Sequence, residues 1–106
     1  MNIYELEFLG IAKDISSLLE RELLDDFPEF SNKEFKKKVY SLKVEDIILV
    51  EKLFLEGEEK TAVNYSNFNL IYINSSMWPI TRKSQRLMYQ IIFHEILGLM
   101  KVEKEK

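Results

Sequence analysis

One segment near the C-terminal end constrains the fold more than any other. Residues 84–100 are mostly apolar and read SQRLMYQIIFHEILGLM. At about 100° per residue, the apolar side chains cover most of the circumference of a helix. Such a helix must be covered on several sides, so we expect it to be the central helix of the core. Thr81 or Ser84 can serve as its N-cap, and the helix should end near Met100.

Two polar residues, His94 and Glu95, lie deep in this predicted helix. A buried carboxylate without a partner is very costly, so Glu95 needs a partner or a proton. The candidate partners are Arg82, Arg86, His94 and the tyrosines. Gly98 is also informative, because glycine inside a helix costs about 1 kcal/mol relative to alanine. We expect it where another backbone or a bulky side chain comes close to the helix.

The same residues form part of a metal-binding pattern. In H-E-x-x-H, two histidines one helical turn apart ligate zinc, and the glutamate activates the bound water. Here Gly98 stands in place of the second histidine, and His94 is the only histidine of the chain. A catalytic zinc needs about three protein ligands. The sequence therefore favours a core histidine beside a paired glutamate. The alternative keeps His94 as a metal ligand and Glu95 as a catalytic base.

The middle of the chain predicts strands, because its apolar residues are β-prone and turn residues interrupt them. Three strands are expected, separated by turns at 57–59 and 66–69: residues 47–55, 61–65 and 70–73. Residues 47–74 are thus predicted to form a three-stranded antiparallel meander.

The N-terminal part predicts a short strand and two helices. Alternation of apolar residues with glutamates favours a strand over residues 2–9. A helix is expected over residues 14–27, because apolar residues recur at helical spacing before Pro28. Ser31 and Glu34 match a capping box at the start of another helix. The expected fold is a single α+β domain over residues 1–106, with the meander and this possible strand packed against about three helices.

Composition excludes several classes of protein and site. The net charge is −3, whereas nucleic-acid binders carry a basic excess, so no nucleic-acid partner is expected. The chain has no cysteine, which excludes disulfides and thiolate metal sites. It shows no signal peptide and no apolar run of about 20 residues. We expect a soluble cytoplasmic protein with no membrane partner, or a secreted one if a signal peptide has been removed.

The segment from Leu53 to Val102 carries an ordered set of short motifs. They are Thr61-Ala62-Val63-Asn64-Tyr65, Leu70-Ile71-Tyr72-Ile73-Asn74, Trp78, and His94-Glu95-Ile96-Leu97-Gly98-Leu99. This order resembles an uncharacterised family of small bacterial proteins with a degenerate, zincin-like His-Glu-x-x-Gly helix. The resemblance implies a zincin-like arrangement, with the meander beside the helix that carries His94 and Glu95. It implies no activity, because the family's own helix also lacks the second histidine.

The leading functional hypothesis is a non-catalytic binding or regulatory domain that engages a protein or peptide and needs no cofactor. Phe68, Tyr72 and Trp78 near the third predicted strand are the candidate groove residues, although aromatic side chains in this position are expected more often to cap the core. An exposed sheet edge can also hold an extended peptide. The first alternative is a zinc-dependent, metallopeptidase-like hydrolase that uses His94 and Glu95. The second is a small acidic inhibitor or immunity-type protein, which size and charge alone support.

Overall fold

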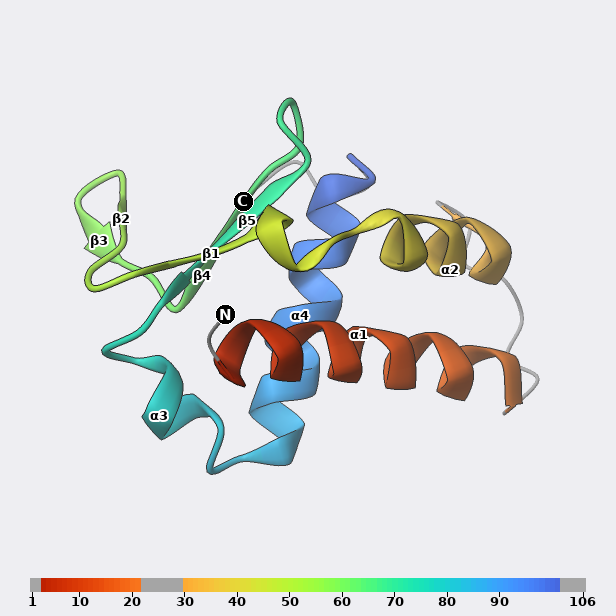
Figure 1. Ribbon diagram of the computed structural model, residues 1–106, viewed down its shortest axis with the longest axis horizontal. Helices are drawn as coiled ribbons and strands as arrows, with labels where there is room; N and C mark the ends of the chain where they lie inside the picture. The colour runs from red at the N-terminus through yellow and green to blue at the C-terminus, as the bar shows by residue number, and fades with distance from the viewer. Residues whose placement is uncertain (1–2, 22–29, 102–106) are drawn as a thin grey trace.

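The computed structural model describes residues 3–21 and 30–101, which form a helical layer and a small sheet (Figure 1). The elements in chain order are α1 (Ile3–Arg21), α2 (Asn32–Ser41), the 3-10 turn η1 (Val44–Asp46), β1 (Ile47–Val50), β2 (Phe54–Leu55), β3 (Glu58–Glu59), β4 (Ala62–Tyr65), β5 (Leu70–Asn74), α3 (Trp78–Thr81) and α4 (Gln85–Leu99). The predicted α+β class is confirmed.

Helix α4 is covered on several sides, as its sequence predicts. Helices α1 and α2 lie side by side and both pack on α4, which also contacts strand β4 (Figure 1). The side chains of Ile92 and Ile96 are fully buried and belong to one cluster with Ile71 and Ile73 of β5. Ser84 is the N-cap, because its hydroxyl accepts a hydrogen bond from the backbone N–H of Leu87 at 3.2 Å.

The prediction of a three-stranded antiparallel meander is wrong. The main sheet has three strands in the order β1-β5-β4, in which β1 runs parallel to β5 and β4 runs antiparallel to it. The first strand, predicted over residues 47–55, ends at Val50 in the structure. The residues that follow form β2, which pairs with β3 in a separate hairpin. Glu56 and Gly57 both have positive φ, which closes this hairpin with a tight two-residue turn. The hairpin separates β1 from β4 along the chain, and β4 lies on the far side of β5 from β1.

The predicted N-terminal strand is also wrong, because residues 3–21 form one continuous helix. The alternation over residues 2–9 coincides with a helical period that extends further along the chain. Phe8, Ala12, Ile15 and Leu19 are the buried positions that continue this period. Leu6, which the alternation would place on the buried face, is half exposed. The predicted helix end near Phe27 and Pro28 lies outside the described residues.

Helix α2 begins where the capping box predicts it. The backbone N–H of Glu34 donates to the Ser31 hydroxyl at 3.1 Å, and Ser31 has the extended backbone of an N-cap. Phe35 and Val39 are its fully buried side chains, whereas Lys33, Lys36 and Lys37 are exposed and Lys38 is partly buried. The Phe35 ring contacts the Phe93 ring of α4, with the centroids 5.4 Å apart. This contact fixes α2 against the central helix.

Candidate functional site

The sheet has two faces with opposite character. Ile71 and Ile73 of β5 belong to the core shared with α4. Because successive side chains of a strand point to opposite faces, Leu70 and Tyr72 project from the other face. We call the face toward α4 the inner face and the opposite one the outer face. The sequence-predicted site residues are divided between them.

Glu95 lies on the inner face, enclosed between α4 and β4. Only 3% of the residue is exposed, and the Asn64 side-chain amide Nδ2 donates to its Oε1 at 2.9 Å. Asn64 is itself buried on β4, so this hydrogen bond joins the helix to the sheet inside the core. The set of partners expected from the sequence did not include this amide. Arg82, which was in that set, forms an ion pair with Glu7 at 2.9 Å.

Gly98 makes room for the Asn64 side chain. A Cβ atom at position 98 would lie 2.5 Å from Asn64 Cγ and 2.6 Å from Oδ1, and closer still to Nδ2. Such distances are well inside van der Waals contact, so no larger residue fits unless Asn64 moves. The predicted close approach at this glycine is confirmed, and the neighbour is a side-chain amide. The residue that replaces the second histidine of a zinc motif therefore has a packing role.

His94 lies beside Glu95 on α4 and is partly buried. It is the only imidazole of the chain, and the chain has no thiol. Among the described residues, no group of three or more His, Cys, Asp or Glu side chains is placed to hold a metal ion. The donor set at His94 and Glu95 thus does not fit the three-ligand requirement of a catalytic zinc.

A groove of about 400 Å³ lies on the outer face. Its lining comes from the end of β1, the following loop, β2, β4, the β4–β5 turn and β5: Val50, Lys52, Leu53, Phe54, Tyr65, Phe68, Leu70 and Tyr72. Half of these residues are aromatic. The structure therefore brings together Phe68 and Tyr72, two of the three residues predicted for a binding groove, and adds Phe54 and Tyr65.

The aromatic residues of the groove are held by sheet geometry yet remain accessible. Tyr65 pairs with Leu70 across β4 and β5, so it is the diagonal neighbour of Tyr72. Their rings meet edge to face, with centroids 5.3 Å apart and an angle of 74°. Phe68 and Phe54 are 73% and 56% exposed, respectively. The packed rings of Tyr65 and Tyr72 thus form the floor of the groove, and the rings of Phe54 and Phe68 at its margins are exposed to solvent.

Trp78 does not line this groove. It is fully buried at the start of α3, where its ring lies 6.1 Å from that of Phe8 between centroids. Its indole N–H donates to Glu7 Oε1 at 3.0 Å, which satisfies the polar edge of the ring. The other oxygen of Glu7 accepts from Arg82, and this hydrogen bond raises the pKa of the guanidinium above its usual value. Trp78 thus ties α3 to α1.

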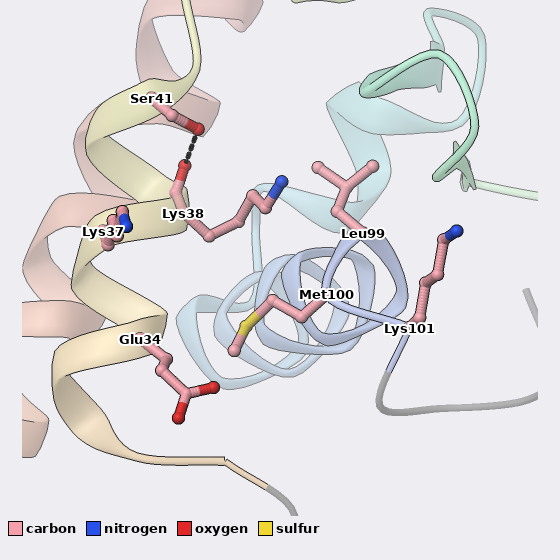
Figure 2. Close-up of a pocket in the computed structure, with 7 residues that line it drawn as sticks. All are labelled: Glu34, Lys37, Lys38, Ser41, Leu99, Met100 and Lys101. Carbon is pink, nitrogen blue, oxygen red and sulfur yellow. Dashed lines mark hydrogen bonds between the residues drawn. The ribbon is translucent and has the colours of Figure 1, made fainter.

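A second pocket, of about 410 Å³, lies between α2 and the C-terminal end of α4 (Figure 2). It is lined by Glu34, Lys37, Lys38, Ser41, Leu99, Met100 and Lys101. Its lysines lie near the end of α4, where backbone carbonyls carry partial negative charge that cations stabilise. The Lys38 ammonium also donates to Asn69 Oδ1 at 3.0 Å. This bond anchors the β4–β5 turn, which carries Phe68, to helix α2.

Among the described residues, no helix combines the length and apolar character needed to cross a membrane. The family resemblance over Leu53 to Val102 remains a prediction based on the motifs themselves. Comparison with models of protein families, with curated proteins and with solved structures finds no significant match to this chain.

Proposed function

We propose that this chain is a non-catalytic binding domain that holds a segment of a peptide or protein partner in the outer-face groove. One observation carries the proposal: four aromatic residues line one open groove, and one of them, Phe68 in the β4–β5 turn, is 73% exposed. Large exposed apolar side chains that gather in one patch mark interaction sites, whereas isolated ones are ordinary.

The residues of the groove have the properties of a binding hot spot. Tyrosine and phenylalanine offer large contact areas and lose little conformational entropy when they bind. Tyr65 and Tyr72 are already packed against each other, so less ordering is needed when a ligand arrives. The Lys38–Asn69 hydrogen bond restrains the turn beside Phe68 in the same way.

The motif on α4 supports a structural role for Glu95. A general base must come within hydrogen-bond reach of its substrate, directly or through one water molecule. The Glu95 carboxylate is enclosed in the core and hydrogen-bonded to Asn64. A zincin-like ancestry of this helix is compatible with the proposal but is not required by it. No specific observation among the described residues favours the hydrolase alternative or the inhibitor alternative.

A peptide library displayed on phage can test the proposal. The wild-type chain is used for selection, and the enriched peptides are then measured against single variants by fluorescence anisotropy. Phe68→Ala and Tyr72→Ala should each weaken binding about tenfold or more, as expected for aromatic residues at the centre of an interface. Circular dichroism should show that these variants remain folded.

The matched control is Ile80→Ala. Ile80 is 71% exposed, nearly the same as Phe68, but lies on α3 and does not line the groove. This change should leave peptide binding within twofold of wild type. Peptides that bind equally well to all variants, or that are lost only with Ile80→Ala, would show that the groove is not the binding surface.

A further inference from the structure

The floor of the outer-face groove offers side chains to a ligand. The backbones of β4 and β5 are paired with each other, and β5 is also paired with β1. β1 and β4 are the edge strands of this sheet, so a ligand lying over Tyr65, Leu70 and Tyr72 rests on its face and not along an open edge where it could form a ladder. An extended ligand in this place keeps the hydrogen bonds of its backbone with water. A polyproline II segment satisfies this condition, because it has no internal hydrogen bonds and its backbone stays solvated.

The polar groups of the groove suit a ligand that is rich in acceptors. In the described lining, the polar side-chain groups are the two tyrosine hydroxyls and the Lys52 ammonium. No carboxylate or side-chain amide occurs in this lining. An ammonium donates hydrogen bonds and accepts none. Proline has a backbone carbonyl and no N–H, so a proline-rich segment presents acceptors without unmatched donors. The apolar pyrrolidine rings also pack well on aromatic rings, as in other aromatic grooves that bind such segments.

The charge of the lining restricts the class of ligand further. Among the described residues that line the groove, Lys52 is the one that carries a charge. Two acidic residues of the β2–β3 hairpin have partners within the chain: Glu58 pairs with Lys60 at 2.8 Å, and Glu59 accepts from the Asn74 amide at 2.9 Å. Glu56, in the turn of the hairpin, does not line the groove. The lysine in the lining therefore favours a ligand carboxylate. A single-stranded nucleic acid would also bring negative charge, but the chain has a net charge of −3 and one lysine in the groove.

We infer that the groove binds a proline-rich segment in the polyproline II conformation with an acidic residue beside its prolines. This inference rests on the proposed function and specifies its ligand. Tyr65, Tyr72 and Phe68 would contact the proline rings, and the Lys52 ammonium would pair with the carboxylate.

The probes are two labelled peptides, Pro-Pro-Pro-Glu-Pro-Pro-Pro and the same peptide with lysine at its centre. Fluorescence anisotropy should show that the wild-type chain prefers the glutamate peptide and that salt weakens this binding. Tyr72→Ala should weaken it about tenfold. Lys52→Glu should reverse the preference, so that the lysine peptide binds more tightly than the glutamate peptide. Ile80→Ala again serves as the control and should change neither affinity.

Two further probes separate the competing ligand classes. A Val-Thr-Val-Glu-Val-Thr-Val peptide represents a ligand that adds as a strand, and a decamer of deoxythymidylate represents single-stranded nucleic acid. The inference is overturned if either one binds more tightly than the proline peptide, or if Lys52→Glu leaves the peptide preference unchanged. If proline-free library peptides depend on Phe68, the proposed function stands and this inference fails. If no peptide depends on Phe68, both fail.

Discussion

The two faces of the sheet differ in how sequence and structure relate. On the inner face, Glu95 and Gly98 belong to a sequence pattern that suggests catalysis, yet both are enclosed and packed against Asn64. On the outer face no catalytic pattern is visible, yet Phe68 and Tyr72 line an open groove. The sequence pattern and the exposure of a residue thus point in different directions on the two faces.

The difference arises from what each face must satisfy. A buried carboxylate requires a nearby donor, so the residues around Glu95 are fixed by hydrogen bonding and packing. An exposed ring has no such requirement, and its presence lowers solubility without helping the core. Exposed rings that gather on one surface therefore need a reason outside the fold, and binding is the usual one.

Substitution of a fully buried aromatic residue and of the most exposed aromatic residue in the groove should give the largest contrast. Trp78→Ala removes a fully buried side chain and its hydrogen bond to Glu7, so we expect a loss of roughly 3–5 kcal/mol in the free energy of unfolding. Phe68→Ala should change that free energy by no more than about 0.5 kcal/mol, as for other surface sites. Urea denaturation measures both values. Comparable losses would show that Phe68 belongs to the core and would remove the contrast.

The glycine on the inner face gives the next largest effect. Gly98→Ala should lower the free energy of unfolding by roughly 2–3 kcal/mol, because the new methyl group overlaps Asn64 and displaces it from Glu95. Gly10→Ala is the matched control. Gly10 lies inside α1 with nothing within 4 Å of an added Cβ, so alanine there should stabilise by up to about 1 kcal/mol.

A double-mutant cycle sharpens this prediction. Asn64→Ala removes the side chain that Gly98→Ala would strike, so the two changes together should cost clearly less than the sum of the single changes. Denaturation of all four chains gives the coupling free energy. Additive costs would mean that the contact between Asn64 and position 98 does not explain the glycine.

A smaller effect is expected at the hairpin beside the groove. The hydrogen bond from Lys60, together with its charge, holds the pKa of Glu58 below its ordinary value. Stability from this pair is therefore present above the unfolded-state pKa of the glutamate and is lost as pH falls through the lower folded-state pKa. Both groups are substantially exposed, so the contribution is small. Carboxyl NMR titration should show the lowered pKa, and Lys60→Ala should return it toward the ordinary value.

The smallest expected effect is the response to zinc. Because the donors around His94 do not form a three-ligand set among the described residues, added zinc should leave the midpoint of thermal unfolding unchanged. Differential scanning fluorimetry with and without zinc measures this. A clear rise in the midpoint that disappears in His94→Ala would show a metal site on the inner face and would reopen the hydrolase alternative.

Local signals in the sequence predicted much of the fold. Ser31 and Ser84 mark helix starts because their hydroxyls accept from the backbone N–H three residues later. The apolar circumference of residues 84–100 correctly indicated a helix covered on several sides. These features depend only on neighbouring residues, so a sequence displays them directly.

Features that depend on distant residues were harder to predict. The parallel pairing of β1 with β5 joins strands that are separated along the chain by the β2–β3 hairpin and β4. The amide partner of Glu95 lies 31 residues away on β4, and helix periodicity contains no information about it. An aromatic residue near a strand end suits either a groove or the core, so the sequence alone leaves both open for Trp78, and the structure places it in the core. Its hydrogen bond to Glu7 spans 71 residues of sequence.

The alternation along β5 has a consequence for how this molecule can change. Leu70 and Tyr72 contribute to the groove, whereas Ile71 and Ile73 contribute to the core. Neighbouring positions in one strand are therefore under separate constraints, so the side chains that line the groove can be exchanged while the scaffold beneath them stays the same. A library that varies only the outward positions would show which of these side chains the proposed binding requires.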